Sequence, residues 1–212
     1  MRILITAGGT REYIDPVRFV SNASSGKMGY ALARVAAVRG HLVTLITAPT
    51  SLRPPPRVQV ANVVSAADMF QAVRQRFDDC DCLIMAAAVA DYTPVGASGT
   101  KIKKSGDRLT VELKPTRDIL KWAGRNKQGR IVVGFALEDQ SLRERAEQKL
   151  HEKNLDVIVA NSPAAIGADS STVHIKTADG SWMILVDTLK RRTANRILEQ
   201  IETVALAKSH LP

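Results

Sequence analysis

A strand–helix–strand stretch at the start of the chain decides the fold. It runs R-I-L-I-T (Arg2–Thr6), then S-G-K-M-G-Y-A-L-A-R-V-A-A-V-R (Ser25–Arg39), then L-V-T-L-I-T (Leu42–Thr47). The outer segments are apolar without a break, as in strands of a parallel sheet that helices cover on both faces. The middle segment has a helical pattern, and Gly40 follows it as a C-terminal stop. This order predicts a doubly wound α/β fold.

The same alternation continues along the chain. We expect a helix at Ala66–Phe77 and further buried strands at Val58–Val63, Cys82–Ala88, Ile131–Phe135 and Val157–Ala160. Ligands of doubly wound folds collect at the carboxyl ends of the strands, so the segments that follow each strand are the candidate sites.

Two regions depart from this alternation. Ser98–Leu113 has a basic turn followed by R-L-T-V-E-L, an alternating strand pattern that predicts an excursion from the sheet, suited to a flap or a subunit contact. Ser171–Val186 contains two strand patterns around Ala178-Asp179-Gly180 and predicts a β-hairpin. A final helix is expected at roughly Thr188–Lys208.

Length and composition indicate one ordinary globular domain, residues 1–212. No stretch is apolar for long enough to span a bilayer, and the N-terminus carries no cleavage-site pattern, so we expect a cytoplasmic protein without a membrane partner. Cys80 and Cys82 lie beside an apolar run and are expected to be reduced core or strand-edge residues.

The formal net charge of +9 indicates an anionic partner. Nucleic acid, a small polyanion such as a nucleoside triphosphate, and a basic surface kept for solubility all remain compatible with it. Nothing resembles a reading helix, a zinc finger or an aromatic stacking platform, so no nucleic-acid partner is expected.

The first strand is followed by T-A-G-G-T-R-E (Thr6–Glu12), which is neither G-x-G-x-x-G nor a Walker loop. It fits a tight turn as well as a phosphate-binding one. The segment Asp15–Gly29 is rich in residues that bind anions or cap helices. Ser24 or Ser25 can cap the next helix, whose N-terminus favours phosphate, and Arg18 and Asn22 can donate hydrogen bonds. Capping alone is the alternative.

Three later segments carry further candidates. Asp91 follows the small residues Met85–Ala90, where a ligand could approach the backbone closely. Lys101–Lys104 (K-I-K-K) is either a solvated face or a clamp for a developing negative charge. Gly134-Phe135-Ala136 could pack against a base, and Lys149 and Lys153 are spaced i, i+4, which suits either triphosphate contact or an exposed face.

Together these segments resemble the phosphopantothenoylcysteine synthetase family. The resemblance covers nearly the whole chain, in order, through G-G-T-R-E-x-x-D-P-V-R-F-V-S-N-A-S-S-G-K-M-G (Gly8–Gly29), A-A-V-A-D-Y (Ala87–Tyr92), K-I-K-K, D-I-L (Asp118–Leu120), V-G-F-A (Val133–Ala136) and K-x-x-x-K-N-L-D (Lys149–Asp156). It implies a Rossmann-like fold and a homodimer with the Ser98–Leu113 excursion near the partner. In many bacteria such a domain is half of a bifunctional protein that also carries a flavin-dependent decarboxylase.

The chemistry that the resemblance implies has two steps. The carboxylate of 4'-phosphopantothenate attacks the α-phosphate of a nucleoside triphosphate, CTP in most bacterial members, with Mg²⁺ neutralising the triphosphate. The acyl-nucleotide then reacts with the amine of L-cysteine. The resemblance assigns Asn22 to the intermediate, Arg18 to support of that site and Lys101 to formation of the acyl-nucleotide.

The candidate nucleotide-binding residues, taken from both the strand ends and the resemblance, are Gly8, Gly9, Ser24, Ser25, Gly26, Ala87, Ala88, Asp91, Arg117, Asp118, Ile119, Phe135, Lys149 and Lys153. No metal ligand is assigned. Two departures concern the nucleotide loops: Arg117 stands where many relatives have proline, and 166–171 lacks the G-F-x-S-x-x-N pattern of relatives.

Two other functions compete with this one. A nicotinamide- or flavin-binding oxidoreductase would share the fold, but G-x-G-x-x-G is missing and no acidic residue ends the second strand, which leads to Thr47-Ala48-Pro49-Thr50. A non-enzymatic nucleic-acid-binding module is suggested only by the charge, and salt-sensitive DNA binding without nucleotide turnover would favour it.

Overall fold

The computed structural model describes residues 1–106 and 108–209. Within them, eight strands form one main sheet in the order β12-β11-β10-β9-β6-β1-β4-β5. The strands are β1 Arg2–Ala7, β4 Leu42–Thr47, β5 Val58–Asn62, β6 Cys82–Met85, β9 Ile131–Leu137, β10 Val157–Asn161, β11 Ser170–Thr177 and β12 Met183–Leu189. Neighbours from β5 to β10 are parallel, and the hairpin β11–β12 adds two antiparallel strands at one edge. This confirms the mostly parallel α/β fold.

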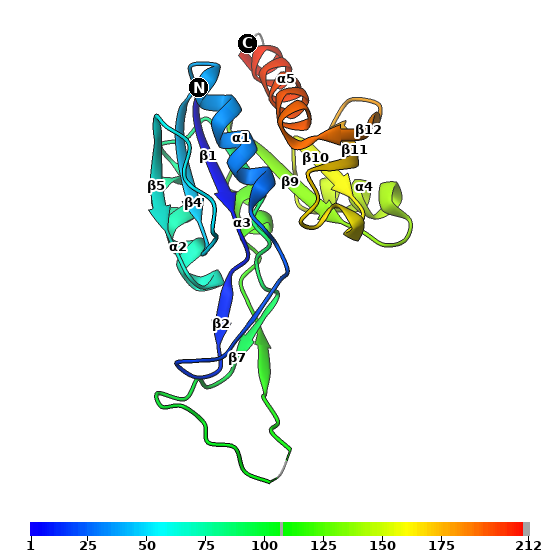
Figure 1. Ribbon diagram of the computed structural model, residues 1–212. Coiled ribbons are helices and arrows are strands. Elements are labelled where there is room, and N and C mark those ends of the chain that lie inside the picture. Colours follow the sequence, from blue (N-terminus) through cyan, green and yellow to red (C-terminus); the bar gives the residue numbers. More distant parts are fainter. Residues whose placement is uncertain (107, 210–212) are drawn as a thin grey trace.

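Helices cover both faces of the main sheet (Figure 1). On one face lie α1 Lys27–Val38 and α5 Lys190–Ser209; on the other lie α2 Ala66–Phe77, α3 Ile119–Arg125 and α4 Leu142–Glu152. Successive β1 side chains point to opposite faces. Ile3 and Ile5 therefore pack with α1 and α5, while Leu4 packs with α2. Burial on both faces explains the unbroken apolar run Ile3–Ile5 within the strand.

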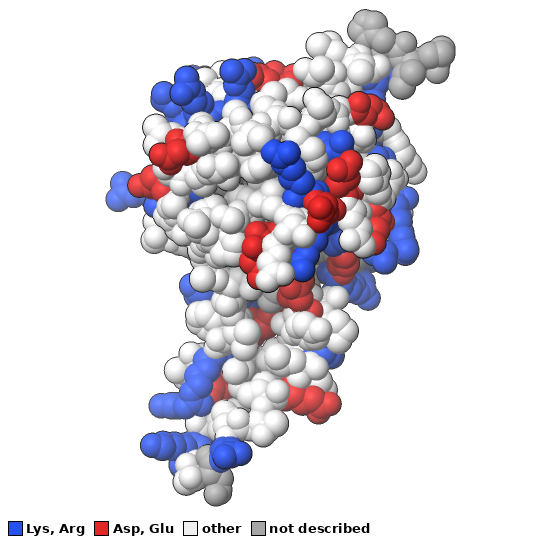
Figure 2. Space-filling view, turned by 90° about the vertical axis from the view of Figure 1, so that its right-hand side faces the viewer, with Lys and Arg blue, Asp and Glu red and all other residues white. Residues whose placement is uncertain are grey.

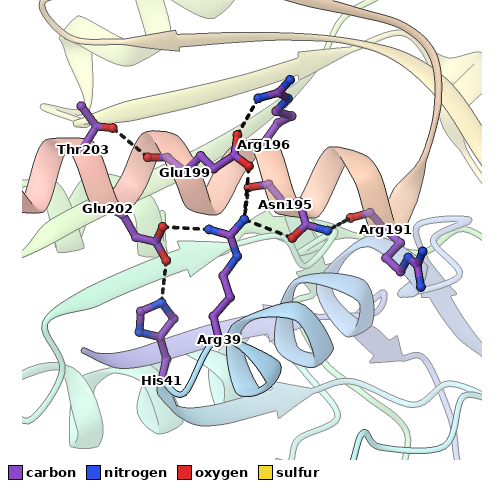
Figure 3. Close-up of polar contacts among 8 residues, drawn as sticks. All are labelled: Arg39, His41, Arg191, Asn195, Arg196, Glu199, Glu202 and Thr203. Carbon is purple, nitrogen blue, oxygen red and sulfur yellow. Dashed lines mark hydrogen bonds and ion pairs between the residues drawn. The ribbon is translucent and has the colours of Figure 1, made fainter.

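A polar cluster joins the end of α1 to the middle of α5 (Figure 3). The guanidinium of Arg39 donates to Glu202 at 2.7 Å, to Asn195 Oδ1 at 3.1 Å and to Glu199 at 3.3 Å. His41 Nε2 lies 2.9 Å from the other oxygen of Glu202. These contacts fix the two helices over the same face of the sheet.

Two short hairpins form an arm that projects from the main sheet, as Figure 1 shows. The first pairs β2 Arg11–Tyr13 with β3 Phe19–Ser21, and the second pairs β7 Tyr92–Pro94 with β8 Leu113–Pro115. The Ser98 N–H donates to the Ile14 carbonyl at 2.8 Å and ties one hairpin to the other. The chain enters this arm twice, after β1 and after β6.

Several boundaries differ from those expected. The helix predicted from Ser25 begins at Lys27, because Gly26 takes a left-handed conformation (φ 75°) as its N-cap. The strand predicted to reach Ala88 ends at Met85, where its backbone turns toward the loop after β1. The alternating strand expected within Ser98–Leu113 is absent from the described part, which omits Asp107; the strand there is Leu113–Pro115, and the pairing with the β7 side ends at the bond from the Val95 N–H to the Glu112 carbonyl.

Other expectations agree with the structure. The hairpin predicted at Ser171–Val186 and the final helix are present as β11–β12 and α5. Cys80 and Cys82 are both buried and free, which confirms the expectation of reduced core residues. In the part of the chain that is described, none of the helices combines the length and apolar character needed to traverse a bilayer.

Gly29 sets how closely α1 approaches β1. A Cβ at this position would lie 2.5 Å from the Ala7 Cβ and 2.9 Å from the Thr6 carbonyl oxygen. We expect the steric clash in Gly29→Ala to lower the free energy of unfolding by about 1–3 kcal/mol. The better helix propensity of alanine offsets at most about 1 kcal/mol of this loss. Urea denaturation measures it. The matched control is Gly99→Ala, since nothing lies within 4 Å of that site; equal stability of the two variants would contradict the packing argument.

Candidate active site

A cavity of about 570 Å³ opens at the carboxyl ends of the central strands. Segments 22–28, 85–89, 116–120, 135–137 and 165–167 line it, and Lys149, Lys153 and Lys190 reach it from two helices. From β1 the sheet continues through β4 and β5 on one side and through β6, β9 and β10 on the other. The strand order therefore reverses between β1 and β6, and ligands of doubly wound folds bind at such a switch point.

Most of the residues predicted from the sequence meet at this cavity. Those that line it are Asn22, Ser24, Ser25, Gly26, Ala87, Ala88, Asp91, Arg117, Asp118, Ile119, Phe135, Lys149 and Lys153. They come from five separate stretches of the chain. The prediction that strand-end segments converge therefore agrees with the geometry, while the role of each residue stays a prediction.

Gly8 and Gly9 were expected to bind the nucleotide, but they lie behind the wall of the cavity. Gly8 is left-handed (φ 81°), and its carbonyl accepts the Ala88 N–H at 2.8 Å. A Cβ on Gly9 would lie 2.7 Å from the Asn22 carbonyl oxygen. These glycines allow two cavity-lining loops to pack closely on the end of β1, so they support the site from beneath.

The Asn22 side chain sits where these two loops meet. Its Nδ2 donates to the Val89 carbonyl at 3.1 Å, which joins the segment after β3 to the segment after β6. Its amide group borders the cavity. The same amide can therefore hold the two walls together and present a polar group to a ligand.

One end of the cavity carries Lys149 and Lys153. Lys149 donates to the Phe135 carbonyl at 2.9 Å, and Lys153 pairs with Asp118 at 2.8 Å. Lys153 follows the last residue of α4, yet both lysines reach the cavity as the i, i+4 spacing predicted. Burial, and then the neighbouring Lys153 ammonium, lower the pKa of Lys149. An anionic ligand would relieve this repulsion.

The opposite end carries two lysines that the sequence did not reveal as site residues. Lys27, at the first turn of α1, pairs with Asp169 at 2.7 Å and donates to the Gly167 carbonyl at 3.0 Å. Lys190, at the start of α5, donates to the Ala165 carbonyl at 3.3 Å. Burial and the nearby Lys27 ammonium lower the pKa of Lys190. The sequence offered one signal for Lys27, its position within the Gly8–Gly29 motif.

Ser24, Ser25 and Gly26 form the turn into α1. No side chain caps this helix, and its first turn contains no acidic residue. The two serine hydroxyls make only long contacts, 3.4 Å from the Gly26 N–H and 3.5 Å from the Lys27 N–H. Capping by Ser24 or Ser25 was therefore wrong, and the helix start faces the cavity without a carboxylate of its own.

Arg18 and Lys101 lie on the arm and do not line the cavity. Arg18 pairs with Asp15 at 2.6 Å and donates to the Ile102 carbonyl at 3.1 Å. The Lys101 side chain is exposed, as are Lys103, Lys104 and Arg108, and Figure 2 shows lysine and arginine gathered at the far end of the arm. Within one chain these predicted catalytic residues are thus separated from Asn22's cavity.

Comparison with known proteins places this chain in a family. Residues 1–205 match the model of the DNA/pantothenate metabolism flavoprotein C-terminal domain. The chain belongs to this family. It is 46% identical over 208 residues to the Coenzyme A biosynthesis bifunctional protein CoaBC of Bacillus subtilis, a match that covers 96% of this chain. The chain spans about half the length of that relative, 51%.

Solved structures of the family share the fold. The C-terminal domain of a Coenzyme A biosynthesis bifunctional protein CoaBC matches with a TM-score of 0.84 and 44% identity, covering 95% of this chain and 94% of that one. The DNA/pantothenate metabolism flavoprotein from Streptococcus pneumoniae matches with a TM-score of 0.85 and 26% identity, covering 96% and 99%. The likeness thus extends over the arm as well as the main sheet.

Arg117, one of the departures from the family pattern, has a structural role in this member. Its guanidinium carbon lies 5.1 Å from the centre of the Phe70 ring, a cation–π contact between the loop before α3 and α2. Arg117 also borders the cavity. Arg117 therefore joins the loop before α3 to α2 by a contact that proline could not make.

Lys27 and Lys190, which line the cavity beside the start of α1, predict an anion subsite. We expect Lys27→Gln and Lys190→Gln each to weaken binding of inorganic pyrophosphate about tenfold, because each removes one charge-assisted hydrogen bond. Isothermal titration calorimetry measures the affinity. Arg74→Gln is the control, since it removes the same charge from the exposed last turn of α2. Affinities equal to that of the control would exclude the lysines from the subsite.

Proposed function

We propose that this chain is a ligase that forms the amide bond between 4'-phosphopantothenate and L-cysteine in coenzyme A biosynthesis. The observation that carries the proposal is the family membership together with a cavity whose two ends are both cationic. CoaBC of Bacillus subtilis, whose match covers 96% of this chain, is described as a coenzyme A biosynthesis protein. A nucleoside triphosphate and a phosphorylated acid are both anionic, as such a cavity requires.

The reaction would take place in two steps. The substrate carboxylate attacks the α-phosphate of CTP, forming an acyl-cytidylate and releasing pyrophosphate. The amine of cysteine then attacks the acyl carbon, the amide bond forms, and CMP leaves while the amine loses a proton. No covalent bond to the protein is needed, so binding, orientation and charge stabilisation are the tasks of the side chains.

Each task has a candidate in the structure. Lys149 and Lys153 would bind the nucleotide beside Phe135, while Lys27 and Lys190 would hold the leaving pyrophosphate. Asn22, at the meeting point of the two walls, would orient the acyl-nucleotide for cysteine. Lys101 would stabilise the charge that develops at the α-phosphate.

We also propose CTP as the nucleotide and Mg²⁺ as the metal ion that accompanies it. In the described residues no group of three or more His, Cys, Asp or Glu side chains could hold a metal ion. Mg²⁺ in nucleotide sites is commonly bound by one or two carboxylates and the substrate phosphates, and the carboxylate-bearing residue Asp91 borders the cavity. The residues present fit a metal that enters with the triphosphate and neutralises its charge.

A homodimer would bring the arm of one chain to the cavity of another. The arm exposes several large apolar side chains: Tyr13, Val17, Phe19, Val20, Tyr92, Val95 and Leu113. Exposed apolar surface of this kind is typical of a protein interface. Because Lys101 lies outside the cavity of its own chain, we propose that it acts on the nucleotide bound to the partner.

The two half-reactions separate the proposed roles. Wild-type protein should release pyrophosphate from CTP, 4'-phosphopantothenate and Mg²⁺, and form the amide when cysteine is added. Asn22→Asp should form the acyl-cytidylate but pass it poorly to cysteine, because the amide donor is lost. Lys101→Gln should instead lose the first step while keeping the fold. A pyrophosphate assay and single-turnover chromatography measure both steps.

Three results would contradict these assignments. Wild-type protein that releases no pyrophosphate with any nucleoside triphosphate would exclude the ligase. First-step loss in Asn22→Asp would exclude the role of Asn22, and normal first-step turnover in Lys101→Gln would exclude the role of Lys101.

Subunit mixing tests the shared site. Neither Asn22→Asp nor Lys101→Gln alone should form the amide efficiently. In a mixed dimer, one cavity combines an intact Asn22 with an intact Lys101 from the partner, so activity should return after co-refolding. The amide product is measured, and self-mixed samples are the controls. Mixed dimers that form without regaining activity would show that Lys101 acts within its own chain.

A further inference from the structure

The carboxylate of Asp15 is buried in the turn between β2 and β3, with 1% of the residue exposed. One oxygen, Oδ1, accepts the backbone N–H groups of Val17 and Arg18, each at 2.8 Å. The other, Oδ2, accepts Nη1 of Arg18 at 2.6 Å and the Ile102 N–H at 3.2 Å. The first oxygen therefore serves the local turn, and the second reaches across the arm.

This carboxylate is held in its charged form. Burial acts to raise the pKa of Asp15, but the N–H groups of Val17, Arg18 and Ile102 and the Arg18 guanidinium outweigh it and lower the pKa. A buried charge is retained only where such partners surround it. Three of the four bonds come from Val17 and Arg18 within the same turn, and the fourth, from Ile102, needs a separate explanation.

That explanation lies in the backbone of Ile102. Its N–H donates to Asp15, and its carbonyl accepts Arg18 Nη1 at 3.1 Å. Both backbone polar groups of this residue, which belong to the peptide units before and after it, are thus held by the Asp15–Arg18 pair. Residues 101–106 form neither helix nor strand and are largely exposed, so this contact fixes a segment that would otherwise have little to hold it.

Lys101 immediately precedes the residue that is fixed. We propose that Asp15 is a positioning residue that, with Arg18, holds the Ile102 peptide and so aims Lys101 at the nucleotide of the partner chain. The inference rests on the proposed function, because it acts through Lys101. It also gives Arg18 a role different from support of Asn22: Arg18 completes the contact with the loop of Lys101. A misplacement on the order of 1 Å would cost about a hundredfold in rate.

Asp15→Asn separates this role from support of the turn. The asparagine Oδ1 can still accept the Val17 and Arg18 N–H groups, whereas its Nδ2 is a donor facing two other donors. The turn is thus retained and the Ile102 contact is lost. Glu12→Gln is the matched control: Glu12 is a buried carboxylate on the same hairpin, but its Oε1 accepts the Ala66 N–H at 2.8 Å, away from the loop.

Hydrogen exchange and half-reaction kinetics together test the proposal. Asp15→Asn should exchange faster in residues 98–106 and form the acyl-nucleotide about ten- to a hundredfold more slowly, while consuming preformed acyl-nucleotide with cysteine at the wild-type rate. Glu12→Gln should match wild type in hydrogen exchange of residues 98–106 and in the rates of both half-reactions. Arg18→Gln, which removes the guanidinium that contacts both Asp15 and the Ile102 carbonyl but keeps the backbone N–H at position 18, should reproduce the Asp15→Asn phenotype and guards against misfolding of the latter.

Combination with Lys101→Gln shows whether Asp15 acts through that lysine. The double variant should be no slower in the first step than Lys101→Gln alone, because coupled residues are not additive. Three results would each overturn the positioning role. The effects of the two substitutions on the first step could multiply in the double variant. Asp15→Asn could lose both half-reactions equally, or it could keep a wild-type first step despite faster exchange. Wild-type protein without pyrophosphate release would contradict the ligase itself, and the exchange data would still show whether Asp15 holds the loop.

Discussion

The end of β1 creates a hydrogen-bonding constraint on which the rest of the site depends. Beyond that point regular strand pairing gives way to a single bridge between Gly9 and Ala88, and the loops after β1 and β6 need further partners for their backbone groups. Two buried threonines supply them: Thr6 Oγ1 accepts the Ala87 N–H at 3.1 Å, and Thr10 Oγ1 accepts the Ala90 N–H at 2.9 Å. With the bond from the Ala88 N–H to the Gly8 carbonyl, they hold the two loops together where Ala87 and Ala88 line the cavity.

The same departure from the sheet produces the arm. Because the chain leaves after β1 and again after β6, two hairpins far apart in sequence emerge side by side and bind each other through Ser98 and Ile14. The cavity and the arm are therefore consequences of one geometry. It places Asn22 at the base, where the loops meet, and Lys101 farther along the arm, which is the geometric basis for the proposal that two chains share a site.

Local signals explain which parts of this structure the sequence could predict. Leu42–Thr47 and Ala66–Phe77 were placed at their observed ends, since a mainly apolar run and the Ser65–Asp68 capping box are properties of neighbouring residues. The strands of the arm are 3 residues long and α3 has 7, and such short segments carry too little periodicity to reveal them. Lys190 was hidden for another reason: only the docking of α5 brings it to the cavity.

The distribution of charge favours small anions over nucleic acid as the partner of this basic protein. Much of the surface charge is already paired, as in Arg39 with Glu199 and Glu202, so net charge alone says little about binding. The informative cations are Lys149 and Lys190, whose pKa values are lowered by burial and by a neighbouring lysine, Lys153 and Lys27 respectively, because each would gain from an anion in the cavity. All four lysines line one cavity, an arrangement suited to a compact polyanion and unlike a groove that follows a nucleic-acid backbone.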